Sequence, residues 1–308
     1  MISINGLNKK IKGTEILREI SFNVTDGEIL GFLGPNGAGK STTMKIITGF
    51  WTPSGGTVTV NGLDVEKDSL KIRERIGYLP ENVPLYDEMK VLEYLKFIAQ
   101  IRGISTREIA EKIDKAAQAC GLQDRLRQPI EELSKGYRQR VGLAQAIIHE
   151  PDILILDEPT TGLDPNQIVD IRNLIKDIGR DKTVIFSTHI LSEVQATCDR
   201  VVIINNGTIV GQGTPAELLA QGGGETIYVK IRGPREAIIA TLDALEIVEA
   251  VLERDHEAND VIGYEITPKD NADVREMLSG IVIRNNWSIL EFSRRGASME
   301  DVFRNLTR

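Results

Sequence analysis

Residues 34–41 read Gly34-Pro35-Asn36-Gly37-Ala38-Gly39-Lys40-Ser41. They follow the apolar segment 28–33 and precede a helical apolar pattern beginning near Lys40, which is the strand–loop–helix context of a phosphate-binding loop. Backbone N–H groups of such a loop and of the helix start point at phosphate oxygens. We expect Lys40 to reach the β- and γ-phosphates and the Ser41 hydroxyl to be a ligand of Mg²⁺. The pattern predicts a nucleoside triphosphate site built from residues 34–41 and Thr42; the alternative is a glycine-rich turn with a solvated lysine.

The composition is that of an ordinary globular chain of one large or two ordinary domains. It has 308 residues, 41% of them hydrophobic, and a formal net charge of -8, which argues against a nucleic-acid partner. Cys120 and Cys198 lie far apart without a metal-binding pattern, which favours a reduced, cytosolic compartment. The N-terminal residues do not read as a signal peptide, and apolar runs such as Val201–Ile204 are far shorter than the roughly 20 residues that span a bilayer. Any membrane-spanning part is therefore expected on another chain.

The sequence of the first two thirds of the chain predicts an α/β fold around a parallel sheet. The short apolar runs Ile153–Leu156 and Val184–Phe186 show no alternation, as in strands covered on both faces. Between them, apolar residues from 168 to 178 recur at helical spacing, giving a strand–helix–strand crossover. Strands at 201–205 and 208–211 around Asn205-Asn206-Gly207 predict a hairpin. Residues from about 85 to 149 are mostly helical and are expected to form an inserted subdomain.

A run of three glycines, 222–224, predicts a linker, because consecutive glycines do not hold a packed element. We therefore expect one domain over residues 1–221 and a second over 225–308. The second is predicted to have strand, helix, strand, strand, helix and strand in that order, a small α+β ferredoxin-like arrangement, followed by a short helix from Ser298. Its predicted elements cover 227–231, 235–245, 247–253, 261–267, 273–286 and 288–293.

Two adjacent acids end the apolar strand at 153–156. A carboxylate at the tip of a strand beside a phosphate loop is where Mg²⁺ or its water ligand is held, which makes Asp157 a candidate metal ligand. Glu158 is placed to deprotonate or orient the water that attacks the γ-phosphate. Alternatives are two solvated acids at a strand end and, for Glu158, a second metal ligand.

The segment Leu133-Ser134-Lys135-Gly136 opens an amphipathic helix. Capping of that helix would account for Ser134 without any ligand. The same placement also makes a second anion site, in which the Ser134 hydroxyl and the Gly136 amide point at a phosphate.

Three motifs in this order, Gly34–Ser41, Leu133–Gly136 and Asp157-Glu158, resemble the nucleotide-binding subunit of ATP-binding cassette (ABC) transporters. The resemblance covers residues 1 to about 220 and implies a P-loop ATPase that binds ATP and Mg²⁺. It also implies a head-to-tail dimer with a second cassette, in which each ATP lies between Gly34–Ser41 of one chain and Ser134–Gly136 of the other.

Further matches assign family roles to single residues. His189, after Ser187-Thr188, resembles the catalytic switch histidine, and Gly162-Leu163-Asp164 resembles the D-loop. Asp164 with Pro165 and Gln167 is also a helix start with a capping box, which needs no dimer. At the Q-loop position the chain has Glu81, a candidate metal ligand, in place of glutamine.

At the position of the family's adenine-stacking aromatic residue the chain has Ile11, in Leu7-Asn8-Lys9-Lys10-Ile11. Ile11 offers apolar contact without an aromatic face. We therefore expect poor discrimination between ATP and GTP.

The segments Pro80–Tyr86, Leu133–Arg140 and Ser298–Phe303 resemble the type-2 bacterial exporters of the drug-resistance, gliding-motility and copper-maturation kind. This implies an ATPase that energises a separate integral membrane permease, from a cytoplasmic, peripheral position on the inner face of the membrane. The alternative is an ABC ATPase acting in translation or DNA repair without a membrane partner. One phosphate loop and the lack of sustained heptads favour the transporter subunit.

Overall fold

The computed structural model describes residues 1–221, 226–258, 260–269, 272–295 and 299–307. The chain divides into two units, Met1–Pro215 and Ala216–Arg308. This division lies after the first residue of the helix α8 (Pro215–Gln221), whereas the predicted linker at 222–224 falls outside the described residues. Within the described part of the chain, no helix is long and apolar enough to cross a membrane.

A six-stranded sheet forms the centre of the first unit, with the strand order β10-β9-β3-β8-β7-β6. Five neighbouring strands run parallel, and β10 pairs antiparallel with β9, so the predicted parallel core is confirmed. All five residues of β7 and all six of β8 are buried, which explains their unbroken apolar sequences. The strands are β3 (Ile29–Leu33), β6 (Ile76–Leu79), β7 (Ile153–Asp157), β8 (Thr183–Thr188), β9 (Arg200–Asn205) and β10 (Thr208–Gly213).

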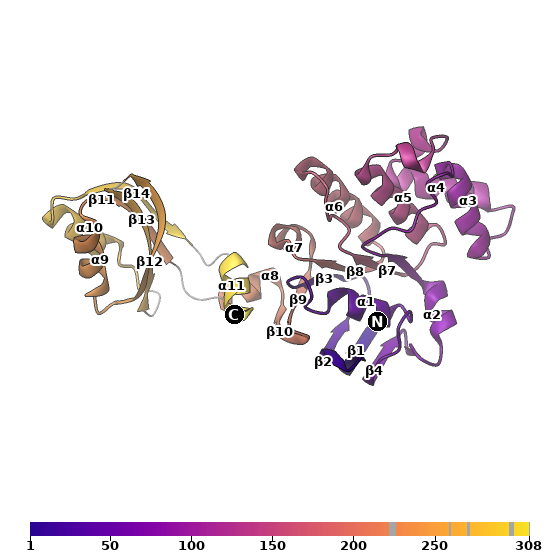
Figure 1. The fold of residues 1–308 in the computed structure, drawn as a ribbon, viewed down its shortest axis with the longest axis horizontal. Helices are drawn as coiled ribbons and strands as arrows, with labels where there is room; N and C mark the ends of the chain where they lie inside the picture. Colours follow the sequence, from indigo (N-terminus) through magenta and orange to yellow (C-terminus); the bar gives the residue numbers. More distant parts are fainter. Residues whose placement is uncertain (222–225, 259, 270–271, 296–298, 308) are drawn as a thin grey trace. The chain divides into compact units, whose positions relative to one another are not determined.

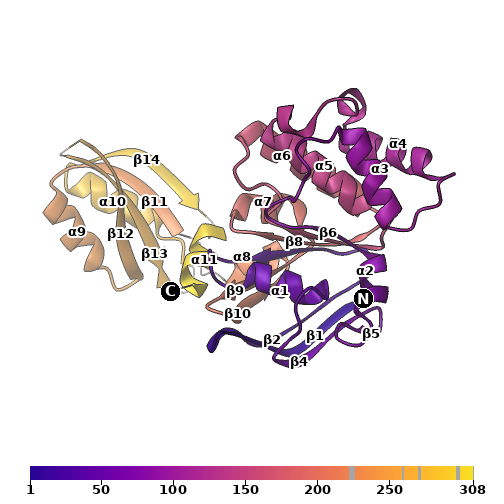
Figure 2. The same cartoon turned by 45° about the vertical axis from the view of Figure 1, so that its right-hand side comes forward.

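Helices cover both faces of this sheet. The helix α1 (Lys40–Ile47) lies on one side, and α5 (Lys135–Ile147), α6 (Pro165–Gly179) and α7 (Leu191–Thr197) lie on the other (Figures 1 and 2). The crossover helix predicted between β7 and β8 is α6. The predicted hairpin joins β9 to β10 through Asn206 and Gly207, whose φ angles of 48° and 78° suit a primed two-residue turn.

The inserted helical subdomain consists mainly of α3 (Val91–Ile101), α4 (Ile109–Cys120) and α5, with two short 3₁₀ turns, Gln123–Arg125 and Ile130–Glu132. This agrees with the prediction for 85–149. The helix α2 (Ser69–Arg75) precedes β6.

A second sheet of the first unit was not predicted. It has four antiparallel strands in the order β2-β1-β4-β5, and its core is continuous with that under the central sheet. The strands are β1 (Ile2–Ile11), β2 (Thr14–Val24), β4 (Gly55–Val60) and β5 (Leu63–Asp64).

The second unit has the predicted strand and helix order and an antiparallel sheet ordered β12-β13-β11-β14. Two of its helices contribute to its core together with the sheet; Ile238 and Leu278, one from each helix, belong to the same apolar cluster as Tyr264 of the sheet. The elements are β11 (Thr226–Arg232), α9 (Arg235–Asp243), β12 (Val248–Ala258), β13 (Val261–Pro268), α10 (Arg275–Arg284), β14 (Ser288–Arg295) and α11 (Met299–Leu306). Ser298, the predicted start of the last helix, lies outside the described residues.

Candidate functional site

The loop between β3 and α1 requires glycine at two positions for steric reasons. A Cβ on Gly34 would lie 2.4 Å from the carbonyl oxygen of Ile204. Gly39 has a φ of 110°, and a Cβ there would lie 2.5 Å from the Leu17 side chain. The loop backbone therefore packs directly against β9 and β2, while Asn36 and Gly37 at its tip remain exposed.

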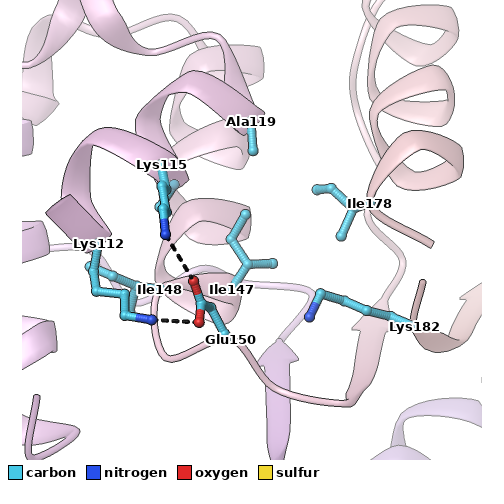
Figure 3. Close-up of a pocket in the computed structure, with 9 residues that line it drawn as sticks. Lys112, Lys115, Ala119, Ile147, Ile148, Glu150, Ile178 and Lys182 are labelled. Atoms are coloured by element: carbon cyan, nitrogen blue, oxygen red, sulfur yellow. Dashed lines mark hydrogen bonds and ion pairs between the residues drawn. The ribbon is translucent and has the colours of Figure 1, made fainter. Parts of the chain in front are cut away.

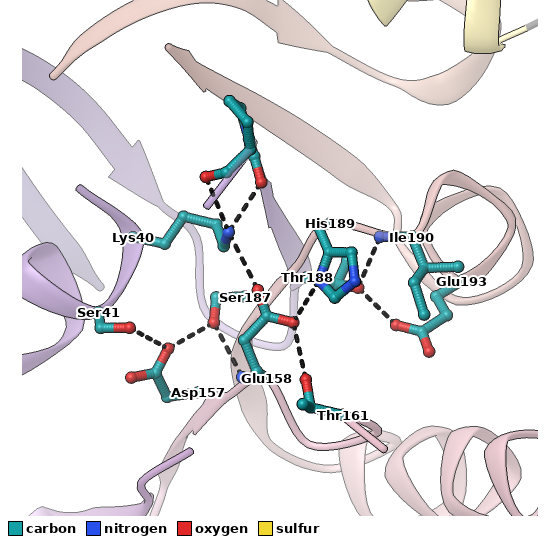
Figure 4. Close-up of polar contacts among 12 residues, drawn as sticks. Lys40, Ser41, Asp157, Glu158, Thr161, Ser187, Thr188, His189, Ile190 and Glu193 are labelled. Atoms are coloured by element: carbon teal, nitrogen blue, oxygen red, sulfur yellow. Dashed lines mark hydrogen bonds and ion pairs between the residues drawn. The ribbon is translucent and has the colours of Figure 1, made fainter. Parts of the chain in front are cut away.

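Lys40 begins α1, and its side chain is 6% exposed. Its ammonium donates to the carbonyl oxygens of Gly34 and Pro35 at 2.7 and 3.2 Å, and lies 3.0 Å from Glu158 Oε1 (Figure 4). The Glu158 contact is an ion pair by distance, without hydrogen-bond geometry. The structure therefore brings the predicted phosphate-binding lysine and the predicted base together.

Asp157, the last residue of β7, lies beside Ser41. Ser41 Oγ donates to Asp157 Oδ1 at 3.0 Å, and Ser187 Oγ donates to the same oxygen at 2.7 Å (Figure 4). Burial raises the pKa of Asp157, as does the neighbouring charge of Glu158, while the hydrogen bonds from Ser187 and Ser41 oppose that rise. A hydroxyl and a carboxylate side by side are a partial oxygen ligand set for a hard cation.

Glu158 follows in a left-handed backbone conformation with a φ of 49°, uncommon for a residue other than glycine. Its backbone N–H donates to Ser187 Oγ at 2.9 Å. Its side-chain Oε2 accepts from the Thr161 hydroxyl at 3.2 Å and lies 2.9 Å from His189 Nδ1 (Figure 4). Glu158 is 6% exposed, so its carboxylate is fixed between a cation, a hydroxyl and an imidazole.

His189 follows directly after β8, with its side chain 44% exposed. The turn that presents it is closed by Thr188, whose hydroxyl accepts from the backbone N–H of Ile190 at 3.0 Å and donates to Glu193 at 2.6 Å. His189 thus combines an exposed edge with a fixed contact to Glu158.

Ser134 and Gly136 lie at a different place, at the start of α5. The Ser134 hydroxyl accepts from the backbone N–H of Tyr137 at 3.4 Å as the N-cap. With Arg140, Gln167 and Asp170, both line a small pocket of the helical subdomain and α6.

The predicted Gln167 capping box is wrong. Asp164 caps α6 by accepting from the backbone N–H of Gln167 at 2.9 Å, with Pro165 in the first turn. The Gln167 side chain does not return this bond within the described residues. It lies against Gly136 instead, where its Oε1 would be 2.9 Å from an added Cβ.

The structure does not join Ile11 or Glu81 to this cluster. Ile11 is partly exposed at the end of β1, and it is Leu17, further along β2, that reaches Gly39. Glu81 is exposed, and within the described residues no hydrogen bond or ion pair links it to Ser41 or Asp157. Described residues also form no cluster of three or more acidic, histidine or cysteine side chains suited to a metal, so a cation at Ser41 and Asp157 would need further ligands from nucleotide phosphates and water.

The side chains of Ser187 and Thr161 belong to the site although no role was predicted for them from the sequence. Ser187 pairs directly with Asp157 in the parallel register of β7 and β8, so its hydroxyl reaches both Asp157 and Glu158. This pairing was the available signal, because Asp157 and Ser187 each directly follow a predicted apolar run, 153–156 and 184–186, and adjacent parallel strands place such residues side by side.

A lysine-lined pocket lies apart from the cluster, between α4, the end of α5 and α6 (Figure 3). Lys112 and Lys115 both face Glu150, and Lys182 donates to the carbonyl oxygen of Pro151 at 2.6 Å. The three lysines of this pocket therefore already form ion pairs or hydrogen bonds with groups of the chain itself.

The comparisons with known proteins all indicate the same family. A family model described as "ABC transporter" matches residues 17–161. The linearmycin resistance ATP-binding protein LnrL of Bacillus subtilis is 31% identical over 309 residues, covering 100% of this chain and 98% of that protein.

Solved structures agree in fold. CbiO1 from Clostridium perfringens, titled part of the ABC transporter complex cbiONQ, has a TM-score of 0.66 and 30% identity and covers 79% of this chain and 95% of its own. The dimeric ATP-binding cassette MJ0796, titled as a post-hydrolysis state bound to ADP and Pi, has a TM-score of 0.63 at 24% identity, covering 70% of this chain and 98% of its own.

Proposed function

The chain belongs to the ABC transporter family as an ATP-binding, ATP-hydrolysing subunit, and from this membership we propose how its residues divide the work. The observation that carries the proposal is the cluster of Lys40, Glu158 and His189, with Ser41 and Asp157 beside it. It combines a phosphate-binding cation, a base and a polar sensor within contact distance of one another.

Lys40 and Glu158 act as a pair that ATP separates. The ammonium now contacts loop carbonyls and the Glu158 carboxylate. Phosphate oxygens offer Lys40 a stronger charge-assisted partner. When Lys40 turns to them, Glu158 Oε1 becomes able to accept a proton from the attacking water, while Oε2 keeps its contacts with Thr161 and His189.

Ser41 and Asp157 would hold Mg²⁺. The ion would supply charge neutralisation between the β- and γ-phosphates. The chain's own contribution is to keep the Ser41 hydroxyl and the Asp157 carboxylate adjacent, with Ser187 fixing the carboxylate from the other side.

Ser134 and Gly136 serve the nucleotide of a second cassette. Within one chain they line a pocket separate from the Lys40 cluster, so a second chain in head-to-tail orientation would be needed to bring the two sites onto one ATP. The dimeric form described for MJ0796 supports this arrangement. Ile11 would lie against the nucleobase of ATP, and Glu81 would lie near the metal and the γ-phosphate.

The partner that uses the ATP-driven closure is a separate integral membrane permease, and the relationship to a drug-resistance protein favours export. The chain would then work at the inner face of the membrane as a peripheral subunit. The naming of CbiO1 as part of a transporter complex also supports a permease partner, whereas nothing in the comparisons favours a role in translation or DNA repair.

Replacing Glu158 with Gln tests the proposed function. The variant should bind Mg-ATP but hydrolyse it about 10² to 10⁴ times more slowly, because the amide cannot act as the base. It should also accumulate as an ATP-bound dimer in size-exclusion chromatography. The exposed Glu236→Gln is the control; turnover by Glu158→Gln at the wild-type rate would place the base elsewhere.

A further inference from the structure

Gln167, in the first turn of α6, has a side chain that the proposed mechanism does not use. Its Cγ, Cδ and Oε1 atoms all lie within 3.4 Å of the point where a Cβ on Gly136 would be, with Oε1 nearest at 2.9 Å. The side chain therefore lies against the backbone of Gly136, which is buried. It forms no hydrogen bond within the described part of the chain, so van der Waals contact holds it there.

Gly136 depends on this contact because glycine cannot fix its own backbone. Gly136 is the second residue of α5, and glycine has the greatest conformational freedom of any residue and no side chain to pack. In the proposed function its N–H meets a phosphate bound to a second cassette. A group with that task has to be held within about 0.5 Å of its productive position. The three atoms nearest to the missing Cβ all belong to Gln167, so Gln167 is the side chain that supports Gly136.

Gln167 itself stands on a rigid element. Its backbone N–H donates to Asp164 Oδ1 at 2.9 Å, which caps α6. One and two turns further along α6, Ile171 and Leu174 are buried, so the helix is anchored in the core of the first unit. The helices α5 and α6 lie side by side in both views (Figures 1 and 2). Gln167 therefore connects an anchored helix to the segment Ser134–Gly136.

Two weaker contacts join the same two helix starts. The side chain of Lys135 lies over Gly162 in the turn before α6, so close that no Cβ would fit there, but Lys135 is exposed. One turn further along, Arg140 Nη2 lies 3.4 Å from Asp170 Oδ2. Asp170 is 63% exposed, and an exposed ion pair contributes little stability. Among these three contacts, the packing of Gln167 is the one that can fix the backbone.

We propose that Gln167 is a positioning residue that, by packing on Gly136, holds Ser134–Gly136 in place for the nucleotide of a second copy of this chain. Gln167 then acts on the composite site that its own Ser134–Gly136 forms with the phosphate loop of the other copy. It does not act on the phosphate loop of its own chain. The proposal rests on the head-to-tail dimer of the proposed function and adds a residue that touches neither nucleotide nor metal.

The variant Gln167→Glu of the full chain tests this position. A glutamate in the first turn of a helix is favoured, so the fold should stay intact while a carboxylate comes to lie beside a phosphate site. In a Glu158→Gln background, the ATP concentration that gives half-maximal dimerisation should rise at least about tenfold, because like charges facing one another across an interface repel. Titration calorimetry of the monomeric chain should show a Kd for Mg-ATP within about twofold of the unsubstituted chain.

Three further variants separate packing from charge. Gln167→Ala removes the atoms that touch Gly136 and should raise the same ATP concentration about three- to tenfold. Gln167→Met keeps the length and packing of the side chain and should restore the value of the unsubstituted chain. Asn173→Asp, exposed on the same helix, makes an equal change of charge and is the control.

Mixed dimers show on which nucleotide Gln167 acts. Two differently tagged chains can carry Lys40→Ala and Gln167→Glu either on separate chains or together on one chain. On separate chains, one composite site keeps both the lysine and the glutamine that serve it, whereas with both changes on one chain each site has one defect. Both dimers contain the same two substitutions, so effects on folding cancel. Only the dimer with separate changes should retain bound ATP after purification through both tags.

Dimerisation of Gln167→Glu at the ATP concentration of the unsubstituted chain would overturn the proposal. Equal ATP retention in the two mixed dimers would do the same, as would higher retention with both changes on one chain. Ser134→Ala, paired with Lys40→Ala in the same two arrangements, tests the proposed function itself. If Ser134→Ala distinguishes the arrangements and Gln167→Glu does not, only this inference is wrong. If neither distinguishes them, the head-to-tail site is wrong and the role of Gln167 is refuted with it.

Discussion

At the scale of single residues, the ion pair of Lys40 and Glu158 matters because both partners are buried. The two charged groups lie 3.0 Å apart, and their side chains are only 6% and 7% exposed. In a buried ion pair, removing one partner costs more stability than the intact pair contributes. The pair therefore holds the two side chains in place, and it also gives ATP a direct way to change the contacts of the general base Glu158.

Replacing Lys40 with Ala should weaken ATP binding by about 1.5–3 kcal/mol, the value of a hydrogen bond to a charged group. Isothermal titration calorimetry with Mg-ATP measures this loss. Lys45→Ala is a matched control on the same helix, because its ammonium lies 4.9 Å from the centre of the Trp51 ring. Unchanged affinity in Lys40→Ala would show that the phosphates bind elsewhere.

The sequence predicted Lys40, Ser41, Asp157 and Glu158 by spacing and His189 by family resemblance, and the structure joins Lys40, Glu158 and His189 in one set of contacts and Ser41 to Asp157 in another. It could not supply the conformations that support them. The left-handed φ of Glu158 and the contact of Thr188 with Glu193 depend on how a strand, a turn and a helix meet. No local pattern of residue types encodes that geometry.

At the scale of elements, the central sheet was predictable because β7 and β8 carry unbroken apolar runs, Ile153–Leu156 and Val184–Phe186. The sheet of β1, β2, β4 and β5 was not predicted. The pairing of β1 with β2 shifts register three times between Ile4 and Lys10. Each shift breaks the alternation of buried and exposed residues by which a half-buried strand is recognised. The strand β5 has only two residues, too few for any pattern.

A half-buried histidine lies where the end of α5 meets β6. His149 follows α5, and its Nε2 lies 3.2 Å from the carbonyl oxygen of Ile76, to which it donates, while its Nδ1 has no partner among the described residues. Burial, together with the charge of Arg102, lowers the pKa of His149 from 6.5 to about 4. The folded protein thus keeps His149 neutral in a range where an unfolded chain protonates it.

This difference predicts acid sensitivity of the first unit. Between pH 6.5 and 4 only the unfolded state binds the additional proton, so the contribution of His149 is complete above pH 6.5 and is lost as the pH falls towards 4. At pH 5 the loss is about 2 kcal/mol. The His149→Gln variant keeps the donor to the Ile76 carbonyl oxygen but cannot take up this proton. Its free energy of unfolding should therefore fall between pH 7.5 and pH 5 by about 2 kcal/mol less than that of the wild type.

Urea unfolding followed by the fluorescence of Trp51, in a Trp287→Phe background, reports the stability of this unit. The exposed His256→Gln, in the second unit, should leave the pH dependence unchanged. An equal pH dependence in wild type and His149→Gln would mean that His149 is protonated in the folded state as readily as in the unfolded chain.

At the scale of the whole molecule, all residues assigned to phosphate, metal and water lie in the first unit. Among the residues described for the second unit, twelve buried ones from Ile227 to Val282 form a core of their own. The helix α8 belongs with this unit and lies beside α11 in both views (Figures 1 and 2). Leu218 of α8 and Val302 of α11 are both buried, so removing α11 alone would expose apolar surface on α8.

Truncation tests whether nucleotide binding and the second unit are separable. A chain ending near Gln221 should still bind Mg-ATP, because it keeps every assigned site residue, but it retains α8 without α11. A chain ending at Pro215 removes α8 as well and should bind equally while aggregating less. Titration calorimetry and light scattering on both truncated chains measure these differences.

The same two chains distinguish regulation from packing. If the second unit regulates dimerisation or permease engagement, the chain ending at Pro215 should keep its melting temperature and change its ATP turnover or its ATP-dependent dimerisation. If the second unit only covers apolar surface of the first, that chain should melt at a lower temperature and aggregate, with normal turnover in its folded fraction. Loss of ATP binding in both folded, monodisperse chains would contradict the assignment of the complete nucleotide site to residues 1–215.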